Sequence, residues 1–267
     1  MDLNGYDNMA DISYFDKLSP YGVSINGAYK IKSPKLIDIS LAGYQRYQAA
    51  LQILLSDEDD LLKTYSESQG IDYDLLKNMA KSIDHESIVF VLLTLEKAFR
   101  DSLINALSFF IENKIVWDEK SKCFLILNEN EEIAVGIIDS KNYEIISDIC
   151  LQLANISKRK PKALKFKNEA ARKFYERFQA AKEKFNKNAK KDKNYEMANI
   201  IAVVATYHNS LNLSNIWELS VFQLYDAFAQ LSKKRQIDIH ETNYSVWGGE
   251  NDPEEWIKRI TSKEEEI

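Results

Sequence analysis

The chain is poor in the residues that break helices and in those that bind metals. Its 267 residues include only 8 Gly, 4 Pro, 2 Cys and 3 His. The shortage of Gly and Pro argues against a turn-rich β-sandwich and favours helices. Two cysteines cannot form a disulfide framework or a four-ligand zinc site, and no histidine stands in a metal-binding spacing. We therefore expect neither a cofactor nor a metal.

Long apolar runs are also missing. The most apolar stretch, 88–95, is far shorter than the roughly 20 residues that span a bilayer. The opening Met-Asp-Leu-Asn-Gly-Tyr-Asp has neither the basic flank nor the apolar run of a signal peptide. We therefore expect no membrane partner and a reducing cytoplasm, in which Cys123 and Cys150 are buried thiols.

Catalytic motifs do not occur in the sequence. It has no Gly-x-Ser-x-Gly elbow, no Walker loop and no Gly-x-Gly-x-x-Gly turn. The acidic run 57–60 would spread its carboxylates by about 100° per residue around a helix, which suits a solvated helix start better than a cation site. The sequence predicts a protein that is not an enzyme and has no catalytic residues.

Charge is distributed unevenly along the chain. The formal net charge of −6 gives no general attraction to nucleic acid or acidic membranes. Residues 158–193 hold 15 Lys/Arg and 4 Asp/Glu, which leaves 20 basic against 37 acidic residues elsewhere. Lysines dominate this segment, and lysine binds phosphate with little readout of bases. An electrostatic contact with an acidic protein surface is therefore favoured over nucleic-acid binding.

Hydrophobic periodicity predicts a predominantly α-helical α+β fold. It has an N-terminal β-hairpin over 22–32 with an Asn26-Gly27 turn, a small central antiparallel meander and C-terminal helices. The strands of the meander are expected at 115–117, 123–127 and 132–138. Helices are expected at 39–55, from 57, at 71–82, at 85–113 with Asp84 as cap, from Asp139 or Ser140 to Ala154, at 197–207, at 216–231 and around Trp256.

Four segments follow from these shifts in pattern and charge. They are an N-terminal arm (1–21), an α+β domain (22–156), a basic linker helix (157–194) and a C-terminal helical domain (195–267).

Three stretches carry a family resemblance. Residues 31–39 read Ile-Lys-Ser-Pro-Lys-Leu-Ile-Asp-Ile, and residues 215–228 read Asn-Ile-Trp-Glu-Leu-Ser-Val-Phe-Gln-Leu-Tyr-Asp-Ala-Phe. A weaker third stretch is 138–146. In this order they resemble a protein family encoded in the tail modules of phages and prophages of Gram-positive bacteria. The end departs from the family pattern, because Trp247-Gly248-Gly249-Glu250 replaces an Ala-Gly-Ala-like turn before a Trp-containing helix.

The resemblance implies a tail-assembly role, and aromatic helical faces supply candidate contact residues. At helical spacing, Trp217 shares a face with Val221, Leu224, Tyr225 and Phe228, which suits either a core or an interface. The candidate protein-interaction residues are Trp217, Val221, Phe222, Tyr225, Phe228, Phe174, Phe178 and Trp256.

The leading hypothesis is a non-enzymatic phage tail assembly protein, a chaperone that binds the tape-measure or tail-tube protein. It would act in the cytoplasm of the bacterial host. One alternative is a structural component of the tail or baseplate, which stays in the virion. Another is a nucleic-acid-binding regulator that uses the basic segment. Self-association into a homo-oligomer is also left open.

Overall fold

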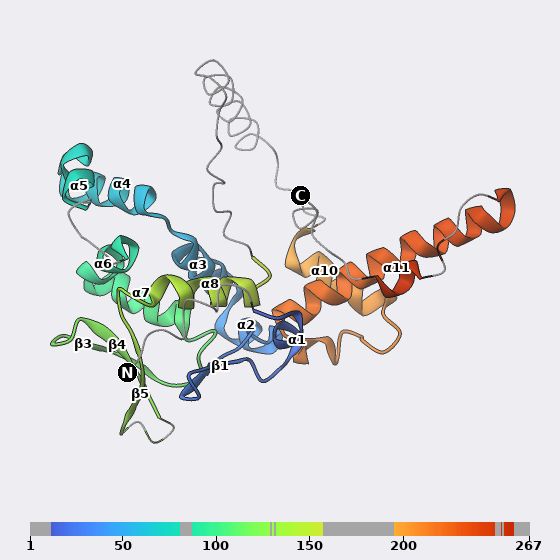
Figure 1. Cartoon of the computed structure of the whole chain (residues 1–267), viewed down its shortest axis with the longest axis horizontal. Coiled ribbons are helices and arrows are strands. Elements are labelled where there is room, and N and C mark those ends of the chain that lie inside the picture. The colour runs from blue at the N-terminus through green and yellow to red at the C-terminus, as the bar shows by residue number, and fades with distance from the viewer. Residues whose placement is uncertain are drawn as a thin grey trace, which may run out of the picture.

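The computed structural model describes residues 12–80, 87–128, 130, 132–156, 195–248, 252 and 254–258. Within them the chain is an α+β protein dominated by helices, as the sequence predicts (Figure 1). The expected basic linker helix, with Phe174 and Phe178, lies outside the described residues, as do residues 1–11 of the expected arm and Asp84.

The N-terminal hairpin is confirmed. After the short helix α1 (Tyr14–Leu18), strands β1 (Val23–Ile25) and β2 (Tyr29–Ile31) pair antiparallel. Asn26 and Gly27, in the three-residue loop between them, have φ values of 51° and 69°, a left-handed backbone that favours Asn and Gly in hairpin turns.

Helices follow the hairpin, and one of them is broken where we predicted continuity. They are α2 (Leu36–Ala42), α3 (Tyr44–Leu55), α4 (Glu58–Gln69) and α5 (Tyr73–Ala80). The single helix expected over 39–55 is wrong, because Gly43 has a φ of 99° and separates α2 from α3. Asp57 caps α4 by accepting a hydrogen bond from the Asp60 backbone N–H at 2.8 Å.

The long helix predicted over 85–113 is also two helices, α6 (Ile88–Leu95) and α7 (Lys97–Leu107). Glu96 is extended, with φ −106° and ψ 142°. The Thr94 carbonyl accepts a hydrogen bond from the Arg100 guanidinium at 3.2 Å, so a side chain satisfies it where the helix is interrupted. The break lets α6 pack on α4 while α7 packs on α3.

The predicted meander is confirmed. Strands β3 (Ile115–Asp118), β4 (Cys123–Leu127) and β5 (Ala134–Ile138) form one antiparallel sheet in that order. Phe124, Ile126 and Ile138 are buried on one face, against Phe90 of α6. Both cysteines are buried free thiols, as expected.

The last elements are α8 (Tyr143–Leu153), α10 (Met197–Tyr207), the 3-10 turn η3 (Ile216–Glu218), α11 (Val221–Trp247) and the 3-10 turn η4 (Glu255–Ile257). Helix α8 begins a few residues later than predicted, since Asp139 accepts hydrogen bonds from the backbone of Lys141 and Asn142. Helix α10 matches its predicted range.

The C-terminal helix predicted over 216–231 is wrong at both ends. Leu219 and Ser220 are extended, so Trp217 lies in η3 and does not continue the face of α11. Helix α11 then runs on to Trp247, where Gly248 ends it with a φ of 73°. In Figure 1, α10 lies beside the beginning of α11, and the rest of α11 projects beyond it.

One hydrophobic core joins the hairpin, the helices and the beginning of α11. Fully buried members from distant parts of the chain include Ile25, Leu36, Leu153, Ile216 and Leu224. The domain boundaries stay a prediction. In the part of the chain that the structure describes, no helix combines the length and apolarity needed to cross a membrane.

Candidate functional site

The two stronger motifs of the family resemblance are hydrogen-bonded to each other. The Leu36 backbone N–H donates to the Leu219 carbonyl at 2.9 Å, and the Val221 N–H donates to the Pro34 carbonyl at 2.9 Å. Lys35 and Ser220 sit between them as an isolated antiparallel bridge. The segment that leaves the hairpin therefore pairs directly with the segment that opens α11.

Ser33 ties this junction to α8. Its hydroxyl donates to the Leu153 carbonyl at 2.8 Å and accepts from the Phe222 backbone N–H at 3.1 Å. The residue is buried, so the hydroxyl satisfies two backbone groups that water does not reach.

The first turn of α11 is fixed by a reciprocal cap. The Gln223 backbone N–H donates to the Ser220 hydroxyl at 3.2 Å, and the Ser220 N–H donates to Gln223 Oε1 at 3.0 Å. Gln223 Nε2 also donates to the Leu18 carbonyl, and the Tyr14 hydroxyl donates to Asp226 Oδ1 at 2.7 Å. The motif residues thus anchor α11 to the hairpin and to α1.

Beyond this anchored beginning, most of α11 is exposed to solvent. We call residues 221–231 the proximal part and residues 232–247 the distal part. Large side chains of the distal part are open to solvent: Ile239 is 54% exposed, Val246 63% and Trp247 83%, and Tyr244 is also exposed. Most of the remaining distal residues are exposed too (Figure 1).

One side of the distal part is in contact with η4. Lys233 Nζ donates to the Lys258 carbonyl, and Lys233 and Ile237 are the two half-buried residues of the distal part. Directly after η4, Lys258 donates hydrogen bonds to Asp252 and Glu255, and its bond to Asp252 holds the pKa of the Asp252 carboxyl below its ordinary value. Trp256 and Ile257 remain exposed, and Trp256 lines a groove of about 670 Å³ along α11.

The predicted interaction residues fall into three environments. Val221 and Phe222 are buried in the core, whereas Trp217, Tyr225 and Phe228 are half-buried, and Phe228 packs against Tyr195. Trp256 is 70% exposed. Phe174 and Phe178 lie outside the described residues. Whether these residues contact a partner stays a prediction.

The exposed residues of the distal part were missed at the sequence level. Ile239, Tyr244, Val246 and Trp247 follow a polar run, Ser232 to Gln236, that ended the predicted helix. A spacing of seven between Ile239 and Val246 puts both on one face, and this was the available signal.

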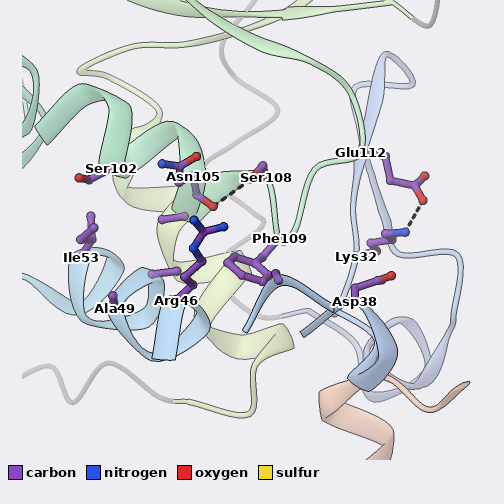
Figure 2. Close-up of a pocket in the computed structure, with 13 residues that line it drawn as sticks. Lys32, Asp38, Arg46, Ala49, Ile53, Ser102, Asn105, Ser108, Phe109 and Glu112 are labelled. Carbon is purple, nitrogen blue, oxygen red and sulfur yellow. Dashed lines mark hydrogen bonds and ion pairs between the residues drawn. The ribbon is translucent and has the colours of Figure 1, made fainter. Parts of the chain in front are cut away.

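A second hollow lies between the α2–α3 region and α7 (Figure 2). This groove of about 580 Å³ has Ala49, Ala50 and Ala106 among its lining residues. Its charged lining residues balance, since Lys32 and Arg46 are basic and Asp38 and Glu112 are acidic, and Lys32 is ion-paired with Glu112. The balance offers no net charge to an ionic ligand, so we assign this groove no function.

Histidine and carboxylate positions do not converge in the described residues. No group of three His, Cys, Asp or Glu side chains there could hold a metal ion. His208 Nδ1 instead accepts hydrogen bonds from the backbone of Ser210 and Leu211, both at 3.3 Å.

Comparison with protein families matches part of the chain. Residues 187–261 match the family model described as the YomV second domain, a range that includes α10, α11 and η4. Searches of curated proteins and of solved structures return no match to the chain. Because YomV is a prophage protein, the family match supports a phage origin for this chain.

Proposed function

We propose that the chain is a non-enzymatic phage tail assembly protein that binds another phage protein through the distal part of α11. The observation that carries this proposal is the set of exposed apolar side chains, Ile239, Val246 and Trp247 among them, on a helix that projects from the packed body. Burying a large apolar side chain stabilises a complex by about 1.5–3 kcal/mol. Aromatic residues such as Trp247 are the type that dominates binding energy at interfaces.

The form of this surface suits a helical partner. The distal part is a regular helix of about 24 Å, from 16 residues at 1.5 Å each. On the side of η4, a groove bordered by Leu231 of α11 and Trp256 offers further contact area. An amphipathic helix binds such a surface through residues spaced three and four apart. The family resemblance points to the tape-measure or tail-tube protein as the partner, held until the tail assembles.

The test is direct binding between the full chain and each of these two tail proteins from the same phage, by isothermal titration calorimetry. Replacing Val246 and Trp247 by Ser should weaken binding by at least tenfold, because the apolar contact is lost. Leu41→Ser is the matched control, since Leu41 on α2 is as exposed as Trp247, at 83%, and lies outside the surface. Equal loss in both variants, or no binding of either tail protein, would contradict the proposal.

Mass spectrometry of purified virions separates the two tail roles. A chaperone that leaves once the tail is complete should be missing from mature particles, whereas a tail or baseplate component should be present in fixed copy number. Presence in the virion would replace the chaperone role by the structural one.

A further inference from the structure

We propose that, when no tail protein is bound, residues 226–247 of α11 pair antiparallel with the same residues of a second copy of this chain. The two helices cross between Gln236 and Ile237. The inference goes beyond the proposed function, because it names the chain itself as an occupant of the exposed helix.

The pairing face is the side of the distal part opposite η4. Lys233 and Ile237 mark the covered side. At 100° per residue, one arc of about 100° on this side contains Arg235, Asp238, Ile239, Thr242 and Val246, which are all exposed. Asp238 stands at the edge of this arc and also lines the groove beside Trp256.

Charge on this face selects the second copy and the direction of pairing. Arg235 and Asp238 carry opposite charges three residues apart, and neither forms an ion pair with any described residue. An antiparallel crossing between Gln236 and Ile237 places each Arg235 opposite the Asp238 of the other copy. A parallel pair would place like charges together, which is destabilising.

The same register brings apolar groups together. Val246 of one copy lies level with Ala227 and Phe228 of the other, both of which are half-buried in their own chain. Thr242 lies level with the half-exposed Leu231. The tip of each helix then meets the exposed ring of Tyr195, which packs against Phe228 with ring centroids 6.5 Å apart.

The size of this contact sets the conditions of the experiment. Two paired helix segments of 22 residues, about 33 Å at 1.5 Å each, form an interface at the small end of specific ones, about 1,200 Å² or less in total. We therefore expect a dimer with a dissociation constant in the micromolar range. Sedimentation velocity of the full chain over roughly 1–100 µM covers that range.

Charge reversal tests the pairing. Arg235→Glu and Asp238→Arg should each weaken the dimer at least tenfold, because each puts like charges opposite one another. The double variant should dimerise like the wild type, and an equimolar mixture of the two single variants should form a heterodimer. Both positions are exposed, so melting curves by circular dichroism should be unchanged.

Direction is read separately from a spin label on Ser245→Cys, since both native cysteines are buried. Antiparallel copies keep the two labels about 25 Å apart along the helices, and parallel copies bring them within about 10 Å. A wild type that stays monomeric to 100 µM, single variants that dimerise normally, a double variant that stays monomeric, or the short label distance would each overturn the inference. Binding of tail proteins is measured independently, so either proposal can fail alone.

Discussion

The proximal and distal parts of α11 share one backbone and differ in almost everything around it. The proximal part is bonded to α1, and Ser33 and Pro34 bond its first turn to the hairpin segment. Leu224 at its centre is fully buried. Across the described residues, the hydrogen bond that links the distal part to a residue outside α11 is the one between Lys233 and Lys258.

This contrast separates what makes the sequence recognisable from what is free to bind. The motif residues 33–36 and 219–223 hold the helix in place, so the recognisable sequence pattern reflects packing inside the protein. The distal part carries no such motif and only a weak hydrophobic periodicity, yet it contains the exposed Val246 and Trp247. A strong motif therefore need not mark the binding residues.

The largest difference should appear on truncating one buried and one exposed apolar side chain of the same helix. Leu224→Ala removes a fully buried side chain and should lower the free energy of unfolding by about 2–5 kcal/mol. Ile239→Ala should change it by less than about 0.5 kcal/mol, because Ile239 is largely solvated. Urea unfolding of both variants measures the two values. Similar losses would mean that the distal part is packed.

The next effect concerns the junction. Ser33→Ala removes the group that bridges the Leu153 carbonyl and the Phe222 N–H, and leaves both without that partner in a buried place. We expect a loss of about 1–3 kcal/mol in stability. Hydrogen exchange should rise at the Phe222 amide and stay unchanged in the distal part. Unchanged protection at Phe222 would show that Ser33 does not hold the junction.

Local signals made much of the fold predictable. The Asn26-Gly27 turn, the Asp57 cap and the strand 123–127 each depend on neighbours in sequence. The breaks at Gly43 and Glu96 could not be predicted in this way, because the helical spacing of apolar residues continues through both positions. Each break lets the helices on either side pack on different partners, and this is decided by tertiary contacts.

The extent of α11 shows the limit of periodicity for the site. The apolar stripe ends at Leu231, so the helix was predicted to end there. Lys233 to Gln236 are good helix formers and carry the helix onward without an apolar face to signal it. Burial decides between core and interface, which is why the candidates Val221 (buried) and Trp256 (exposed) could not be told apart from sequence.

A smaller effect is expected at the helix cap. Ser220→Ala removes the acceptor of the Gln223 N–H and should cost about 1 kcal/mol. Ser232→Ala is the matched control in the distal part, since its hydroxyl only bonds back to the Phe228 carbonyl one turn earlier. Thermal melts of the two variants compare their melting temperatures. Equal decreases would mean that the Ser220 cap does not stabilise the protein more than an ordinary helical serine does.

The smallest effect belongs to the ion pair that spans the two motifs. Lys35 Nζ lies 3.1 Å from Glu218 Oε2, and both side chains are well exposed, so Lys35→Met should cost only about 0.2–1 kcal/mol. Because salt screens exposed charges, the difference from the wild type should shrink between about 0.05 and 1 M NaCl. Leu36 and Val221 donate their backbone hydrogen bonds in both proteins, so the junction should survive the change. A loss of stability as large as that of Ser33→Ala would mean that the ion pair, and not the backbone hydrogen bonds, holds the junction together.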